Sequence, residues 1–222
     1  DVLANLLHKL PPVHRLSSAH VGSMGGIMAI KRKEAHFAGS HLMDEKTIAN
    51  HIPIIQRFLK EIPLVLLNLS YREQGIIIPN GNPANIKDFE DLASPGIKFV
   101  NRQKGSGTRL LTDVLINKFK ISPTKIKGYD LEEYTHMNVA SAVASNRGNA
   151  GMGIRSAAKA LDLDFIPVTE ERYDLIIPKK YFDDEKTAKI LTIIRENKEF
   201  RNTVRAMGGY SLRDSGKIIY EQ

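Results

Sequence analysis

The sequence contains no cysteine and no tryptophan, and only 7% of its residues are aromatic. The absence of cysteine excludes disulfide bonds, thiolate metal sites and a cysteine nucleophile, but it leaves the cellular compartment open. No apolar run approaches the roughly 20 residues that cross a bilayer. His36 and His41 lie five positions apart, and that spacing does not place two ligands on one helix face. We therefore expect no membrane partner, no metal site and no resident cofactor.

A dense basic tract is also lacking, although the 222 residues carry a net charge of +7. The lysines and arginines are spread along the chain and are not interleaved with aromatic residues. Direct nucleic-acid binding by this chain is therefore not expected. The charge is consistent with an ordinary solvated surface or with a field that attracts small anions. With 42% hydrophobic residues we expect one or two compact units. The missing initiator methionine suggests either a piece of a longer protein or a chain that lacks its first residues.

Helical and extended patterns alternate along the sequence. Helices are predicted over Val2–Leu10, Ile27–Lys33, Ile48–Leu59, Ile86–Leu92, Leu110–Phe119, Thr135–Ser145, Ser156–Leu161 and Asp183–Phe200. Strands are predicted over Ala35–Ala38, Leu64–Leu69, Gly75–Pro79, Ile97–Val100, Asn149–Gly153, Phe165–Val168 and Arg172–Pro178. This alternation indicates an α/β protein, and it favours mainly parallel sheets.

Two segments about a hundred residues apart look alike, namely Tyr71–Pro79 (YREQGIIIP) and Glu171–Pro178 (ERYDLIIP). In each, a polar segment with Tyr and Arg leads into an Ile-rich strand that ends in proline. The likeness has two readings: chance, or two crossings between lobes, near residues 70–75 and 170–177. If they are crossings, one lobe comprises residues 1–70 plus 178–222 and the other residues 75–170. A ligand cleft is then expected between the two lobes.

Three turns combine glycine with hydroxyl side chains: Gly22-Ser23 before a helix, Gly39-Ser40-His41 after a strand, and Gly105–Thr108 (GSGT) between a strand and a helix. Glycine lets backbone N–H groups approach a ligand closely, and serine and threonine add O–H donors. A helix N-terminus also contributes a partial positive charge. Turns of this design suit a compact anion, which neutral donors can hold.

Each turn also has a plainer explanation. A serine before a helix is usually an N-cap, which is the alternative for Ser23, and Ser40 could belong to an ordinary loop. At Ser106 and Thr108 the neighbouring Arg102 and Arg109 favour ligand binding, although Lys104 and Arg109 could form a solvated face. His136 and Tyr173 could reach a cleft ligand from a helix start and a crossing strand. They could equally be packing residues.

Motifs of enzymes are not found in these turns. Gly105–Thr108 lacks the Gly-Lys-Ser/Thr end of a nucleotide-binding P-loop. Neither Ser23 nor Ser106 has the Gly-x-Ser-x-Gly frame of a nucleophile elbow. The adjacent Glu132 and Glu133 point apart on regular structure, so a solvated loop is the better reading of that pair. These turns therefore carry neither of these two enzyme motifs.

Six segments together resemble the periplasmic-binding-protein-like domain found fused to molybdopterin-biosynthesis proteins and to helix-turn-helix regulators of molybdate metabolism. This domain is similar to the type II binding proteins for molybdate and tungstate. The segments are Gly22–Gly26 (GSMGG), Glu34–Leu42 (EAHFAGSHL), Tyr71–Gly75 (YREQG), Asn101–Arg109 (NRQKGSGTR), Thr135–Ala144 (THMNVASAVA) and Glu171–Asp174 (ERYD).

The resemblance implies a two-lobed type II α/β fold with two hinge crossings, which closes on a small oxyanion. It also implies a binding domain that performs no catalysis itself and has no catalytic residues. Molybdate or tungstate is then the leading ligand, and a role in molybdenum or tungsten cofactor metabolism, or its regulation, is expected in the cytoplasm. The ligand-binding residues that the resemblance implies are Ser23, Ser40, Arg102, Ser106, Thr108, His136 and Tyr173.

The chain departs from the family pattern in two places. The family has an opening strand and a Ser-His-Asp turn, of which Asp1 corresponds to the last residue, so a further anion donor is expected upstream of this chain. Basic residues at positions 102, 104 and 109 crowd the main turn, so a larger or organic anion remains an alternative ligand. Two other roles stay open as well: the substrate-loading domain of a molybdopterin-biosynthesis enzyme, and the effector domain of a regulator with an upstream helix-turn-helix domain.

Overall fold

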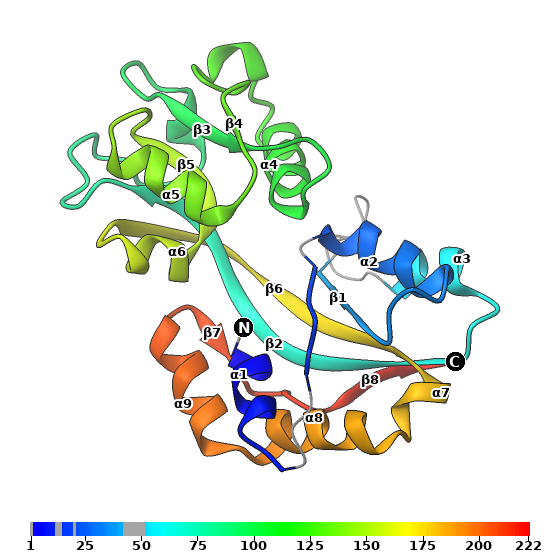
Figure 1. Ribbon diagram of the computed structural model, residues 1–222. Helices are drawn as coiled ribbons and strands as arrows, with labels where there is room; N and C mark the ends of the chain where they lie inside the picture. The colour runs from blue at the N-terminus through cyan, green and yellow to red at the C-terminus, as the bar shows by residue number, and fades with distance from the viewer. Residues whose placement is uncertain (1, 12–14, 20, 42–51) are drawn as a thin grey trace. The chain divides into compact units, whose positions relative to one another are not determined.

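The computed structural model describes residues 2–11, 15–19, 21–41 and 52–222 (Figure 1). Asp1, Leu42 and the first residues of the predicted helix Ile48–Leu59 lie outside these ranges. The chain forms two compact units. Unit 1 comprises residues 1–71, 172–206 and 210–222, and unit 2 comprises residues 72–171 and 207–209. The divisions at 71/72 and 171/172 fall inside two long strands.

Unit 1 is a layered α/β structure with helices on both faces of its strands (Figure 1). Its strands are β1 (Ala38–Ser40), β7 (Tyr210–Ser211), β8 (Ile218–Glu221) and parts of β2 (Leu64–Ile78) and β6 (Asp164–Pro178). Its helices are α1 (Val2–His8), α2 (Gly22–Lys31), α3 (Ile52–Leu59), α7 (Lys179–Phe182), α8 (Glu185–Glu196) and α9 (Lys198–Met207), the last residue of which belongs to unit 2.

Alternation along the strands of unit 1 divides its core into two clusters. Leu66 and Ile176 pack with residues of α2 and α3 on one face. Their neighbours Leu67 and Ile177 pack with residues of α1, α8 and α9 on the other. Successive strand side chains point to opposite faces, so an apolar run without polar interruptions is what a sheet covered on both sides requires.

Unit 2 has its own core around strands β3 (Phe99–Arg102), β4 (Glu132–Glu133) and β5 (Ala150–Ile154) and the other parts of β2 and β6. Val100 and Ile77 pack against residues of α5 (His136–Ala144) and α6 (Arg155–Ala160). Helix α4 (Gly107–Lys118) follows β3 directly, and two 3₁₀ turns cover Glu90–Ala93 and Pro123–Lys125.

The strand order is β1-β6-β2-β5-β3-β4, with β7 and β8 also paired to β2. The prediction of mainly parallel sheets is wrong. Strand β3 pairs in parallel with β4 and β5, whereas the pairs β1–β6, β2–β5 and β2–β8 are antiparallel. The pattern of alternating elements does not encode this, because long strands shared by two units replace the expected helical crossovers.

The two Ile-rich segments are longer strands than predicted. The strands expected over 64–69 and 75–79 are one strand, β2, and those expected over 165–168 and 172–178 are likewise one strand, β6. Polar residues at 71–74 and 171–174 suggested breaks. They instead continue the strands, because they bond to partners on neighbouring strands and elements.

Three helix predictions also need correction. Gly22–Gly26 does not precede a helix but forms its first turns in α2. The helix expected over 86–92 reduces to the 3₁₀ turn Glu90–Ala93. The long helix expected over 183–200 is divided at Asn197, whose extended backbone ends α8 and whose Oδ1 accepts the Phe200 N–H at 2.8 Å. That bond caps the first turn of α9. The strand expected over 35–38 lies at Ala38–Ser40.

Gly75 marks a close approach of β2 and β6 within unit 2. A Cβ atom at this position would overlap the carbonyl oxygen of Ile166 and the ring of Phe165. We expect Gly75→Ala to lower the free energy of unfolding by about 2–3 kcal/mol, because the strand backbone must move to relieve the overlap. Urea denaturation checks this, with the exposed Lys186→Ala on α8 as the control. A change no larger than that of the control would show that the strands are not this close.

Candidate anion-binding site

The start of α2 is bonded to the end of β1 in unit 1. The N-cap position is Val21, which provides no side-chain cap. Ser23 lies inside the helix, and its Oγ accepts the backbone N–H of His41 at 3.1 Å. Ser23 is therefore not an N-cap. It fixes the residue after Ser40 to the first turn of α2, and it leaves that helix N-terminus without a side-chain acceptor.

Ser40 is fully buried on the face of β1 that α2 covers. A Cβ at Gly26 of α2 would lie 2.9 Å from the Cβ of Ala38, so Ala38 faces this helix. Ser40 is two residues further along the strand and points to the same side. Its Oγ has no hydrogen-bond partner within the described part of the chain. Because an unsatisfied buried hydroxyl costs about 1–3 kcal/mol, this atom is a candidate ligand donor.

Asp174 is the partner of Ser40 in the strand register and is also fully buried. Its carboxylate accepts Asn68 Nδ2 at 2.9 Å and Arg172 Nε at 2.7 Å. Directly opposed residues of an antiparallel pair share a face, so Asp174 lies on the α2 side with Ser40. The result is a buried polar group at the end of an otherwise apolar face.

Tyr173 lies on the other face of β6. Its ring stacks on His41, with centroids 5.5 Å apart and planes 18° apart. A Cβ at Gly39 would overlap its hydroxyl, so the absence of a side chain at Gly39 provides room for the tyrosine. Within unit 1 the structure therefore brings Ser23 close to the end of the strand that carries Ser40, but it places the Tyr173 ring on the opposite side of the β1–β6 pair.

The candidate residues of unit 2 gather where β3 ends. Arg102, the last residue of β3, is buried, and its Nη2 donates to the Tyr134 carbonyl at 3.0 Å. Burial, and to a smaller extent the charge of Arg72, lowers the pKa of Arg102 to about 10, while Glu171 opposes the shift. The guanidinium is thus still charged at neutral pH. The Tyr134 bond ties it to the chain just before α5, which begins at His136.

Ser106 and Thr108 form the start of α4. The Ser106 Oγ accepts the Arg109 N–H at 3.1 Å and caps the helix, so this serine does have the capping role. Thr108 is buried in the first turn. His136 begins α5, where Thr135 is the N-cap. Its Nδ1 is 3.8 Å from the position a Cβ at Gly153 would take, so it lies beside β5.

The alternative interpretation of this turn placed Arg109 on a solvated face. The structure shows instead that Arg109 is buried. Its guanidinium bonds Asp113 at 3.0 Å and Glu132 at 2.6 Å, and it lies over the Tyr129 ring. These partners use the charge of Arg109 inside unit 2. Arg102, another of the three basic residues of this turn, is also buried, and it takes no part in the ion pairs that Arg109 forms with Asp113 and Glu132.

Sequence reasoning missed a buried network on β2 and β6. The Glu171 carboxylate accepts Arg72 Nε and Gln74 Nε2, and all three residues belong to unit 2. The signal was present, since each Ile-rich strand carries an acid and an arginine in a segment otherwise suited to burial. Charged residues in such a position are buried only when they are paired.

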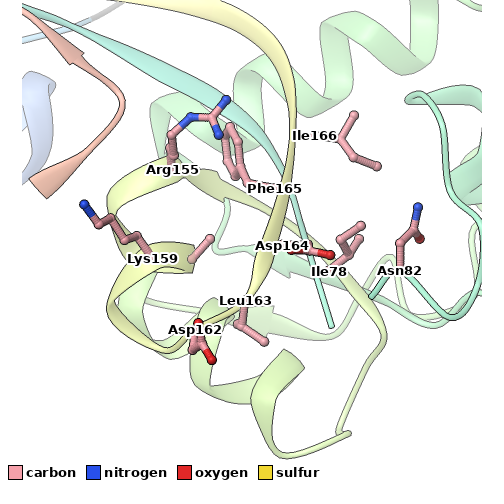
Figure 2. A pocket seen from close by; sticks show the side chains of 10 residues that line it. Ile78, Asn82, Arg155, Lys159, Asp162, Leu163, Asp164, Phe165 and Ile166 are labelled. Carbon is pink, nitrogen blue, oxygen red and sulfur yellow. The ribbon is translucent and has the colours of Figure 1, made fainter. Parts of the chain in front are cut away.

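The described cavity of about 470 Å³ lies elsewhere in unit 2, between α6 and the start of β6 (Figure 2). Figure 2 shows Arg155 beside the Phe165 ring, and Asp162 and Asp164 lie on the same lining. Arg155 pairs with Glu73, and Asp164 accepts the Gly81 N–H at 2.8 Å. None of the seven candidate residues lines this cavity, and its mixed charge does not favour an anion.

The described ranges contain neither a membrane-spanning helix nor a cluster of metal-ligating side chains. No helix there has the length and hydropathy needed to cross a bilayer. No group of three or more histidine, aspartate or glutamate side chains there is arranged to hold a metal ion.

Residues 4–195 match the model of the PBP superfamily domain. The chain belongs to this family. It is 31% identical over 200 residues to the uncharacterized protein YvgK of Bacillus subtilis, covering 90% of this chain and 64% of that protein. The chain therefore spans somewhat less than two thirds of the length of this relative.

Two solved structures share the fold. One is a Clostridium perfringens substrate-binding protein with bound phosphate, described as part of a phosphate ABC transporter; it is 14% identical, with a TM-score of 0.64, and the match covers 92% of this chain and 90% of that one. The other is a Clostridium difficile substrate-binding domain assigned to a molybdenum ABC transporter, 11% identical with a TM-score of 0.63, covering 94% and 91%. The chain thus has the mixed α/β, two-lobed type II periplasmic-binding-protein-like fold.

The Glu171 network supplies a stability test. We expect Glu171→Gln to lower the free energy of unfolding by about 3–5 kcal/mol, because it removes the buried carboxylate from the ion pair with Arg72, whose side chain is 11% exposed. The matched control is Glu199→Gln, which removes an exposed pair with Lys9 and is expected to cost less than about 1 kcal/mol. Urea denaturation of both variants gives the comparison. Equal losses would show that Glu171 is not a buried partner.

Proposed function

We propose that this chain is a small-ligand-binding domain for a tetrahedral oxyanion, and each unit by itself offers candidate donor groups. Unit 1 supplies Ser23, Ser40 and the N-terminus of α2, and unit 2 supplies Arg102, Ser106, Thr108 and the start of α4. The observation that carries the proposal is the Ser40 Oγ, a fully buried hydroxyl without a partner in the described chain, on the strand face that α2 covers. Helix N-termini and hydroxyl donors together suit a compact anion.

Molybdate or tungstate is the proposed ligand, and a cytoplasmic role in molybdenum or tungsten cofactor metabolism, or its regulation, is the proposed context. The motif resemblance supports this choice, and so does the fold shared with substrate-binding proteins named for molybdenum and phosphate transport. The domain is proposed to bind without catalysis. His136 and Tyr173 are kept as weaker ligand candidates, because the first lies beside β5 and the second faces away from Ser40.

Two observations favour a second function, the binding of an organic anion by one domain of a larger protein. Arg102 is buried, and the match to the Bacillus subtilis relative covers only 64% of that protein. A buried guanidinium suits a carboxylate or phosphate group of an organic anion. The domain could then be the effector part of a transcription regulator, or the substrate-loading part of a molybdopterin-biosynthesis enzyme. A fused helix-turn-helix domain would indicate the first of these roles, and a fused enzyme domain the second.

An anion panel tests the function directly. At an anion concentration of about 100 Kd, binding adds about 2.7 kcal/mol to the free energy of unfolding. For a chain of this length that corresponds to roughly 5–10 °C in melting temperature. We expect molybdate and tungstate to produce this shift in differential scanning fluorimetry, with chloride at equal ionic strength as the control. Stabilisation by nucleotides or carboxylates alone would replace the oxyanion by the organic-anion function.

Ser40→Ala separates a ligand donor from a packing residue. A hydrogen bond to a charged group contributes about 1.5–3 kcal/mol, so isothermal titration calorimetry should find molybdate affinity reduced by about 10- to 150-fold. Without anion, the variant should be at least as stable as the parent chain, because it removes an unsatisfied hydroxyl. Ser141→Ala on the exposed side of α5 is the control for both measurements. Unchanged affinity in Ser40→Ala would contradict the proposed donor.

A further inference from the structure

We infer that Arg172 supplies the positive charge of the anion site in unit 1, and that it makes the site prefer doubly charged over singly charged tetrahedral anions. This inference rests on the proposed oxyanion-binding function. It concerns a residue that is the immediate neighbour of Tyr173 in the sequence but lies on the opposite face of β6.

The strand register places Arg172 on the same side as Ser40. Ser40 is opposite Asp174 in the β1–β6 pair, and Arg172 is two residues from Asp174 along β6, so all three share a face. The 2.7 Å bond from Arg172 Nε to Asp174 agrees with this placement. The same face carries Ala38, which contacts the start of α2 near Gly26.

The guanidinium of Arg172 is only partly used by the protein. Asp174 takes its Nε–H, whereas Nη2 is buried and has no hydrogen-bond partner in the described residues. The Asp174 carboxylate thus fixes the Nε edge of the Arg172 guanidinium. The buried N–H groups of Nη2 remain without a partner in the described residues. Unsatisfied buried N–H groups of a cation are costly, and anion oxygens are their strongest partners.

Asp174 is itself held in place by a second donor. Asn68 Nδ2 bonds its other oxygen at 2.9 Å, and both residues are fully buried. The carboxylate therefore cannot rotate away from Arg172 without losing a buried hydrogen bond. A cation fixed by such a pair is preorganised for a ligand.

Charge discrimination follows from Coulomb's law, because the attraction between Arg172 and the anion is proportional to the anion's charge. Tungstate and perrhenate are tetrahedral oxyanions of similar size that carry two charges and one charge. Loss of the cation should therefore weaken tungstate binding about twice as much, on a logarithmic scale, as perrhenate binding.

Isothermal titration calorimetry of the 222-residue chain with both anions tests the inference. In Arg172→Gln we expect tungstate affinity to fall about 100-fold and perrhenate affinity about 10-fold. In Arg172→Lys, which keeps a charge for Asp174 but loses the planar fork, we expect both affinities to fall about 10-fold with their ratio unchanged. Arg195→Lys, an arginine on α8 that bonds the Gly216 carbonyl at 3.1 Å, is the matched control and should bind as the parent chain does.

The outcomes are distinguishable. If the parent chain binds none of the tetrahedral oxyanions, the proposed function fails and this inference fails with it. If the parent chain binds tungstate and the Arg172 variants bind it as tightly, only the role of Arg172 is overturned. Equal losses for tungstate and perrhenate in Arg172→Gln would assign Arg172 a structural role alone. Should Arg172→Gln prove unfolded by circular dichroism, Arg172→Lys decides the question by its affinity.

Discussion

Burial of charged residues within two long strands is the constraint on which this structure depends. Strands β2 and β6 each pass from one unit into the other, and each carries acids, amides or arginines at that passage. Such groups are tolerated in an interior only when every charge has a counter-charge and every carboxylate has donors. Glu171 meets this requirement in unit 2 through Arg72 and Gln74, and Asp174 meets it in unit 1 through Asn68 and Arg172.

These pairs also determine what is left over for a ligand. In unit 1, Asp174 fixes the amide of Asn68 and the guanidinium of Arg172, and Asn68 Oδ1 and Arg172 Nη2 have no hydrogen-bond partner among the described residues. In unit 1 these atoms lie on the strand face that carries Ser40, next to a helix start without a side-chain cap. Stability and binding are therefore linked through the same residues, since the bonds that permit burial also aim the remaining donors.

Much of the fold could be predicted from the sequence, because glycine, serine and proline punctuate apolar runs of recognisable period. The turn at Ser106 and the helix after it follow from the residues themselves. Register could not be predicted: whether Arg172 or Tyr173 shares a face with Ser40 depends on a single residue of strand alignment. The continuity of β2 could not be predicted either. Its polar residues 71–74 indicate a break in the strand unless their partner Glu171 is known to lie beside them.

The division of unit 1 among three stretches of chain affects how the protein acquires its structure. Residues 72–171 form nearly all of unit 2 in one continuous length, so they can fold locally as soon as they are synthesised. Unit 1 cannot, because β8 near residue 220 pairs with β2 near residue 65. The first part of β2 can pack on α2 and α3 early, but its pairing with β8 must wait until synthesis has passed residue 218. During most of that interval the face of β2 that carries Leu67 lacks α8 and α9, which cover it in the folded protein, so the completion of unit 1 is tied to the end of the chain.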